Sequence, residues 1–190
     1  MNNREFNFNK NETLKKLSDA KKEDKVDKDI IPLLDLININ DNYYTSSSCF
    51  GRIVIIELPK IGDKKNARFL GKWHREITTE DFEKALTNSK KGEIWFLAQS
   101  PILHVISKDL DSGDKLIKKA VLCGFKNSGF RSVKKNIVIE IASTERIDMP
   151  IGLDKNLYLK KEYIPILVRY ANEVMKKSIF KITKFEDSLR

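Results

Sequence analysis

Residues 43–58 of the chain read YYTSSSCFGRIVIIEL. The second half, Arg52–Leu58, is a β-branched run that favours a buried strand. The first half places two tyrosines, four hydroxyl-bearing residues, a thiol and a glycine at the entrance of that strand. Small hydrogen-bonding groups of this kind are typical of a polar ligand pocket. The alternative is a solvent-exposed turn whose hydroxyls satisfy its own backbone.

Pairs of strands interspersed with helices make up the rest of the chain. Further strand-like or extended runs lie at residues 68–76, 93–99, 101–107, 125–133, 136–143 and 146–152. Capping residues and apolar spacing predict helices that begin at Asp29, Thr78 and Asp111, and a last helix carries one apolar stripe of Tyr163, Leu167, Tyr170, Ala171 and Val174. We therefore predict an α+β fold, in which helices pack on one side of a largely antiparallel or mixed sheet in two layers. The βαβ alternation of a Rossmann fold is not present in this order of elements.

Two parts of the chain resemble each other. A helix followed by SSSCFGR and IVIIE matches a helix followed by NSGFRS and IVIEIAS. This similarity predicts an internal pseudo-repeat that brings two Ser/Gly/Arg turns to one end of a pseudo-symmetric sheet. We expect a single domain over residues 1–190, with a peripheral polar helical segment at 1–28 and an α+β core at 29–178.

Composition and charge restrict the class of protein. The 190 residues are 41% hydrophobic and 33% charged, which suits a globular domain, and the formal net charge of +9 favours an anionic partner such as RNA or DNA. No apolar run approaches the roughly 20 residues that cross a bilayer. Cys49 and Cys123 lie outside any CxxC pattern and no secretory leader is visible, so we expect a cytoplasmic protein with reduced thiols. His74 and His104 do not have metal-helix spacing, and no metal site is expected.

Two polar side chains interrupt apolar strand faces. His104 lies in ILHVI, where it is either a buried neutral histidine or a pocket histidine that acts as a general base. Glu140 breaks the apolar row of NIVIEIAS in the same way. An unpaired buried carboxylate is costly, so we predict that Glu140 meets a ligand or an arginine, either Arg52 or Arg131.

Two other patterns bear on ligands. GFKNSGFRS begins like a phosphate-binding loop, but Phe130 and Arg131 occupy the positions that need Lys and Ser or Thr, so we predict no nucleotide there. Trp73 and the Tyr43–Tyr44 pair can stack on a nucleic-acid base, although each residue taken alone is more often part of a core or its rim.

Several long segments together resemble one family. YYTSSSCFGRI, GKWHRE, SPILHVISKDLDSGDKLIKKAVLCGFKNSGF, IVIEIASTERIDMPIG and EYIPILVRYANEVM are similar, in this order, to the tRNA wybutosine-synthesizing protein 3 family. The family's Ser-Ser-Cys-small-Gly-Arg motif falls on residues 47–52, and its Leu-His-Val falls on 103–105. Its Gly-Phe-x-x-Ser-Gly falls on 124–129, and its Ser-Thr on 143–144. One departure is Phe50, where the family has a small residue.

The resemblance implies an S-adenosylmethionine-dependent methyltransferase that acts on N4 of the tricyclic wyosine-type base at position 37 of tRNA-Phe, beside the anticodon. It implies a cofactor site outside any Rossmann motif, with cofactor-binding residues Ser46, Ser47, Ser48, Gly51, Arg52, Ser128, Gly129, Ser143 and Thr144. His104 is the first candidate for the catalytic base and Glu140 the second. The expected RNA contacts are Tyr44, Trp73, Arg131, Lys134 and Lys135.

Two other classes of function remain open at this point. The chain can be an RNA-binding module without catalysis, or a structural partner of another modification enzyme. Saturable binding of the methyl donor by the isolated protein distinguishes the enzyme from both. Arg52 meets either the cofactor carboxylate or an RNA phosphate in the enzyme.

Overall fold

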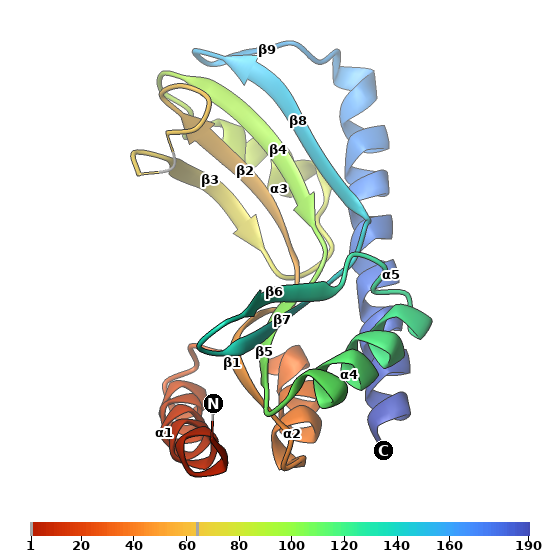
Figure 1. Cartoon of the computed structure of the whole chain (residues 1–190). Coiled ribbons are helices and arrows are strands. Elements are labelled where there is room, and N and C mark those ends of the chain that lie inside the picture. Colours follow the sequence, from red (N-terminus) through yellow and green to blue (C-terminus); the bar gives the residue numbers. More distant parts are fainter. Residues whose placement is uncertain (1, 64) are drawn as a thin grey trace. The chain divides into compact units, whose positions relative to one another are not determined.

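A computed structural model describes residues 2–63 and 65–190 (Figure 1). The chain divides into two compact units: unit 1 contains residues up to Phe50, 101–144 and 178–190, and unit 2 contains residues 51–100 and 145–177. Each unit combines an antiparallel sheet with helices, so the predicted α+β fold without Rossmann order is confirmed. The single domain with its peripheral segment 1–28 and core 29–178 stays a prediction. No helix of the described residues is long and apolar enough to cross a membrane.

Unit 1 contains a four-stranded sheet in the order β1-β5-β7-β6. Its strands are β1 (Tyr43–Cys49), β5 (Ile102–Ser107), β6 (Gly129–Val133) and β7 (Ile137–Ala142). Its helical elements are α1 (Asn3–Lys22), η1 (Lys28–Ile30), α2 (Ile31–Ile39), α4 (Leu110–Leu122) and the C-terminal part of α5 (Ile164–Leu189).

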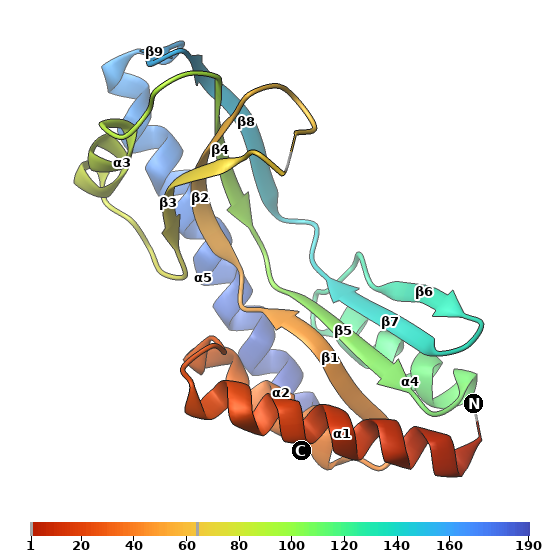
Figure 2. The ribbon, with the colours of Figure 1, turned by 90° about the vertical axis from the view of Figure 1, so that its left-hand side faces the viewer.

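One face of this sheet packs on α2 and α4. Asn38 of α2 accepts a hydrogen bond from the Thr45 amide of β1. The hydroxyl of Tyr43 donates to the Ser112 carbonyl on α4 at 2.8 Å. The other face carries α1, because Phe6 packs its ring 5.2 Å from that of Tyr44. Figure 2 shows α1 alongside β1. Helices therefore lie on both faces of this sheet, where the sequence predicted one covered side.

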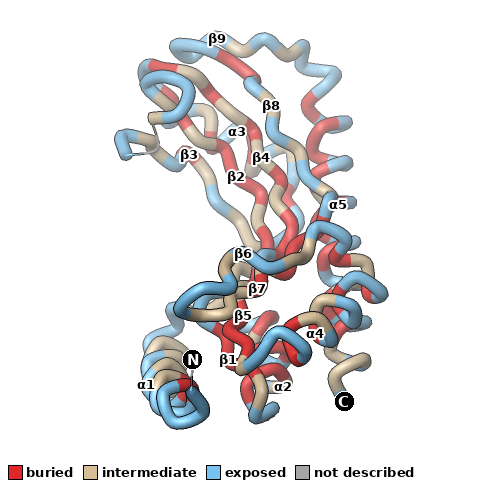
Figure 3. Tube along the Cα trace, in the orientation of Figure 1, coloured by how far each residue is buried: buried red, intermediate tan, exposed pale blue. Residues whose placement is uncertain are grey.

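Unit 2 contains a five-stranded sheet in the order β3-β2-β4-β8-β9. Its elements are β2 (Arg52–Leu58), β3 (Arg68–Trp73), α3 (Thr79–Leu86), β4 (Glu93–Gln99), β8 (Arg146–Leu153), β9 (Asn156–Leu157), η2 (Lys161–Tyr163) and the N-terminal part of α5. Every second residue of β4 is buried, and four of the seven residues of β2 are buried (red in Figure 3). Phe82 of α3 packs on Phe96 with ring centroids 5.6 Å apart, so α3 covers one face.

Several element boundaries match the sequence and others differ. β2 and β4 have the predicted bounds, and Thr78 forms the capping box that begins α3. The helix predicted at Asp111 is capped instead by Asp109, whose carboxylate accepts from the Ser112 amide. Asp29 lies inside the short helix η1 and does not cap α2.

The last helix and the pseudo-repeat also differ from expectation. α5 continues to Leu189, and two residues of the predicted stripe, Tyr163 and Tyr170, are exposed. The two similar strands, β2 and β7, belong to different sheets. The two Ser/Gly/Arg turns therefore do not meet at one end of a shared sheet.

Candidate functional site

The SSSC stretch is a strand rather than a turn, and it contains a β-bulge. β1 pairs antiparallel with β5, and the register shifts between Thr45 and Ser47, so Ser46 is the extra residue. The buried Asn38 holds the strand just before the bulge: its Oδ1 accepts from the Thr45 amide at 2.8 Å and its Nδ2 donates to the Thr45 hydroxyl at 3.0 Å. A bulge re-aims side chains, and here Ser46 and Ser47 both become exposed.

Four polar side chains form a row across the sheet of unit 1. His104 on β5 is paired with Ser47 on one side and with Glu140 on the other. Ser47 Oγ lies 2.8 Å from His104 Nδ1, and His104 Nε2 lies 3.0 Å from Glu140 Oε2. Arg131 donates to the second oxygen of Glu140 at 2.5 Å. The predicted arginine partner of Glu140 is therefore Arg131.

Glu140 is the charged acceptor of this polar row. The hydrogen bond from Arg131 lowers the pKa of Glu140, partial burial opposes that effect, and the hydrogen bond from His104 adds to it. Glu140 is thus ionised at neutral pH, and its Oε2 accepts from the Nε2–H of His104. In the neutral imidazole the other ring nitrogen, Nδ1, carries no proton and accepts from the Ser47 hydroxyl.

The imidazole is accessible. The His104 side chain is 34% exposed, whereas Glu140 is only 14% exposed. A histidine that is oriented through one nitrogen by a carboxylate, and whose other nitrogen meets an exposed serine hydroxyl, has the arrangement of a general base. The alternative of a histidine sealed in the core is wrong.

A polar groove of about 600 Å³ lies beside this polar row, between α1 and the sheet. It is lined by Glu5, Phe8, Asn9, Glu12, Thr13, Lys16, Tyr44, Ser46, Ile106, Lys135 and Asn136. Among the described residues, the Oδ1 atom of Asn136 is the buried side-chain oxygen that has no hydrogen-bond partner. An orphan acceptor in a groove that offers hydroxyls and charges of both signs suits a polar ligand.

The second Ser/Gly turn is largely occupied by internal bonds. Ser128 donates to the Phe125 carbonyl at 2.7 Å and accepts from the Ala142 amide at 3.2 Å. Ser143 is buried and accepts from Lys181 at 2.6 Å. Gly129 opens β6, and Thr144 is exposed after β7. Ser128 and Ser143 therefore hold the local backbone and α5 in this structure.

The residues expected to contact RNA are scattered. Tyr44 is 4% exposed and its ring packs on Phe6, so it is not presented to a base. Trp73 ends β3 in unit 2, where its indole covers Gly71. Lys134 and Lys135 are exposed in the β6–β7 hairpin of unit 1.

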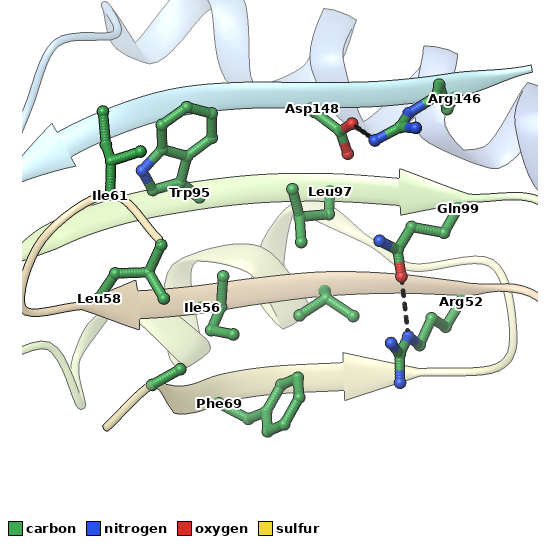
Figure 4. A pocket seen from close by; sticks show the side chains of 12 residues that line it. Arg52, Ile56, Leu58, Ile61, Phe69, Trp95, Leu97, Gln99, Arg146 and Asp148 are labelled. Atoms are coloured by element: carbon green, nitrogen blue, oxygen red, sulfur yellow. Dashed lines mark hydrogen bonds and ion pairs between the residues drawn. The ribbon is translucent and has the colours of Figure 1, made fainter. Parts of the chain in front are cut away.

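Gly51 and Arg52 belong to unit 2. Gly51 has φ +99, a conformation that glycine adopts readily, between β1 and β2. Arg52 lies at one end of a groove of about 500 Å³ on the open face of the five-stranded sheet, where its Nε donates to Gln99 at 2.9 Å (Figure 4).

Two further polar side chains contact the backbone of the Ser-Ser-Cys-Phe-Gly-Arg motif, and neither contact was predicted from the sequence. In unit 1, the carboxylate of Asp27 accepts from the Phe50 amide at 3.0 Å, and Phe50 itself is buried. In unit 2, Nδ1 of His74 lies 2.9 Å from the Gly51 carbonyl. Neither residue carried a local sequence signal, since each contacts a residue 23 positions away in the chain.

Comparison with known proteins places the chain in a family. Residues 8–190 match the model of the methyltransferase TYW3 family, so the chain belongs to this family of methyltransferases. A protein of Thermococcus sibiricus named tRNA(Phe) 7-((3-amino-3-carboxypropyl)-4-demethylwyosine(37)-N(4))-methyltransferase is 43% identical over 97% of this chain and 94% of its own length. A Pyrococcus horikoshii protein of the same name, numbered 1, is 43% identical over 97% of this chain and 94% of its own.

Solved structures agree with this assignment. The structure of the PH1069 protein from Pyrococcus horikoshii matches with a TM-score of 0.95 and 42% identity, over 99% of this chain and 97% of that one. A hypothetical protein from Aeropyrum pernix matches with a TM-score of 0.74 and 25% identity, over 86% of this chain and 96% of that one. The family predicted from the sequence is confirmed.

Proposed function

We propose that the protein transfers the methyl group of S-adenosylmethionine to N4 of the tricyclic wyosine-type base at position 37 of tRNA(Phe), in the cytoplasm. Membership of the methyltransferase family and the names of the relatives support the reaction and the acceptor. The formal net charge of +9 supports an RNA substrate. The observation that carries the proposal is the Ser47–His104–Glu140–Arg131 row on an accessible sheet face.

The acceptor nitrogen loses a proton when it is methylated, and His104 is the group that takes it. Nδ1 is the basic atom, because Nε2 already donates its proton to Glu140. The Ser47 hydroxyl, 2.8 Å from Nδ1, passes a proton to it or gives up its place to the substrate N–H. Glu140 stabilises the imidazolium that results, and Arg131 keeps Glu140 ionised.

The groove between α1 and the sheet is the proposed donor site. The donor, when bound, supplies an electrophilic methyl group on a sulfonium. Ser46 and the orphan Oδ1 of Asn136 fit its hydroxyl and ammonium donors. Ser47 and Ser48 continue this hydroxyl edge along β1. Gly129 and Thr144 stay proposals carried over from the family pattern.

Basic residues of unit 1 are the proposed contacts to the RNA backbone. Lys134 and Lys135 are exposed in one hairpin, and neither forms an ion pair with another described residue, so both can reach a phosphate. Arg131 is held by Glu140, so it orients the carboxylate first and contacts RNA only with its remaining donors. Contacts of this type make the affinity for tRNA fall as salt rises.

Calorimetric titration with S-adenosylmethionine tests the proposal. We expect saturable binding by the wild-type protein, and weaker binding by Asn136→Ala and Ser46→Ala. The control Asn156→Ala, an exposed amide on β9 of unit 2, retains wild-type affinity. Binding of tRNA without any donor binding or methylation, in the presence or absence of tRNA, would identify a non-catalytic RNA-binding module instead.

A further inference from the structure

The open face of the five-stranded sheet in unit 2 carries a groove that the reaction described above does not use. Its lining is ordered in rows across β2, β4 and β8. Arg52, Gln99 and Arg146 are register partners at one end, followed by Val54, Leu97 and Asp148. Two residues further along, Ile56 pairs with Trp95 on one side and with Phe69 of β3 on the other. Figure 4 shows these side chains on the same face.

The aromatic end of the groove is an exposed apolar platform. Phe69 is 53% exposed, although a large aromatic ring is usually covered. The indole N–H of Trp95 donates to Glu93 at 3.0 Å, which satisfies its polar atom and leaves the ring faces apolar. Two aromatic rings on either side of Ile56 form a surface that suits a planar heterocycle.

The polar end of the groove carries an excess of positive charge. Arg146 and Asp148 form an ion pair with each other. Arg52 uses only its Nε, in the bond to Gln99, and over residues 2–63 and 65–190 its two terminal nitrogens form no hydrogen bond. Two guanidinium groups against one carboxylate leave this end net positive, with Arg52 ready to clamp an anion.

These features select one occupant. We propose that the groove binds one unpaired ribonucleotide of the tRNA, with its base on the Trp95–Phe69 platform and its phosphate on Arg52. The inference rests on the proposed function, since it takes tRNA as the substrate. Arg52 and Trp95 are four residues apart on paired strands, which corresponds to roughly 13 Å at 3.3 Å per residue. The long Arg52 side chain covers part of this distance, so one nucleotide can contact both residues.

Other ligands fit the groove less well. The methyl donor carries a sulfonium and is cationic overall, so the excess positive charge at Arg52 and Arg146 opposes it. An apolar segment of a protein partner would cover the platform but would leave the Arg52 guanidinium desolvated and without an anion. A nucleotide satisfies both ends, because the π-face of a base stacks and its phosphate pairs with the guanidinium.

Binding of an anticodon stem-loop RNA by the full-length protein tests the site. We expect Trp95→Ala to weaken RNA affinity by roughly tenfold, because stacking contributes about 1–3 kcal/mol per base. We expect Arg52→Gln to weaken it as well and to reduce the salt slope by about one unit. The matched controls are Phe180→Ala and Arg169→Gln, an exposed ring and an exposed guanidinium on α5, and they retain wild-type affinity.

A second readout guards against a folding defect in the Trp95 variant. In a Trp73→Phe background Trp95 is the only tryptophan, and stacking of a base on it quenches its fluorescence as the stem-loop RNA is added. Trp95→Phe should restore most of the affinity lost in Trp95→Ala, since a ring is retained.

The outcomes separate this inference from the proposed function. If the wild-type protein methylates tRNA while Trp95→Ala and Arg52→Gln bind RNA as the wild type does, the nucleotide site is overturned and the proposed function stands. Loss of donor affinity instead of RNA affinity would make the groove a donor site and overturn the inference. A wild-type protein that neither binds nor methylates tRNA would overturn both.

Discussion

Replacement of Glu140 by glutamine tests how the polar row of unit 1 works. In the wild-type protein the Glu140 carboxylate accepts a hydrogen bond from Nε2 of His104 and fixes the tautomer in which Nδ1 is basic. A glutamine of the same shape can turn its amide N–H towards Nε2, which places the ring proton on Nδ1. The atom that faces Ser47 then has no lone pair to receive a proton.

The expected magnitudes differ for rate and stability. General bases contribute about 10²–10⁴-fold to a rate, so we expect kcat for tRNA methylation to fall by at least about 100-fold. The bond between His104 and Glu140 involves one charged partner and is partly retained by the amide, so we expect a stability loss of about 1–2 kcal/mol. For a chain of this length this corresponds to a fall in Tm of about 2–8 °C.

Single-turnover methylation of tRNA with excess labelled donor measures the rate, and thermal unfolding measures the stability. The matched control is Glu23→Gln, an exposed glutamate that follows α1, which should leave both quantities unchanged. A Glu140→Gln protein that is folded and methylates at the wild-type rate would refute the role of His104 as base. A protein that no longer folds would show that the polar row is structural.

Three further predictions concern single features. Asn38→Ala should lower the free energy of unfolding by about 1–3 kcal/mol in a urea titration, because it leaves buried β1 groups unpaired, and should reduce methylation through the bulge; an unchanged midpoint would contradict this. Burial raises the pKa of Glu57, but the hydrogen bonds from Arg68, Ser89 and the Lys90 amide outweigh this effect, so the net pKa lies below the ordinary 4.5. The ionised carboxylate therefore stabilises the fold above pH 4.5, and this stabilisation is lost as the pH falls through the lower pKa of the folded state. Glu57→Gln should make the free energy of unfolding depend less on pH in this range. Replacing Lys134 and Lys135 together by alanine should reduce the salt slope of tRNA binding by about two units, and an unchanged slope would exclude both from the RNA contact.

The regular elements of this protein were predictable where local pattern decides them. The β-branched runs of β2 and β4 and the Thr78 capping box gave correct boundaries, because each depends on residues within one element. The strand β1 was not predictable, since its Tyr-Thr-Ser sequence lacks apolar alternation. It forms because β5 and Asn38 supply its hydrogen bonds from elsewhere in the chain.

The candidate site was predictable by residue type but not by geometry. An isolated histidine and an isolated glutamate on apolar strands signalled a site, and the register of β5 with β7 makes them neighbours. Local sequence does not specify which strands share a sheet, so the choice between Arg52 and Arg131 stayed open. Asn136 and Trp95 gave no signal, because an orphan oxygen and an exposed platform exist only in the folded chain.

The most direct test of the proposed function is a methylation reaction with the purified protein, S-adenosylmethionine and tRNA(Phe) that carries the demethylated tricyclic base. The nucleosides are then analysed by mass spectrometry. We expect the wild-type protein to add one methyl group at N4 of that base, and His104→Ala to bind the donor normally but leave the base unmethylated. An unmodified base with the wild-type protein, or full methylation by His104→Ala, would contradict it.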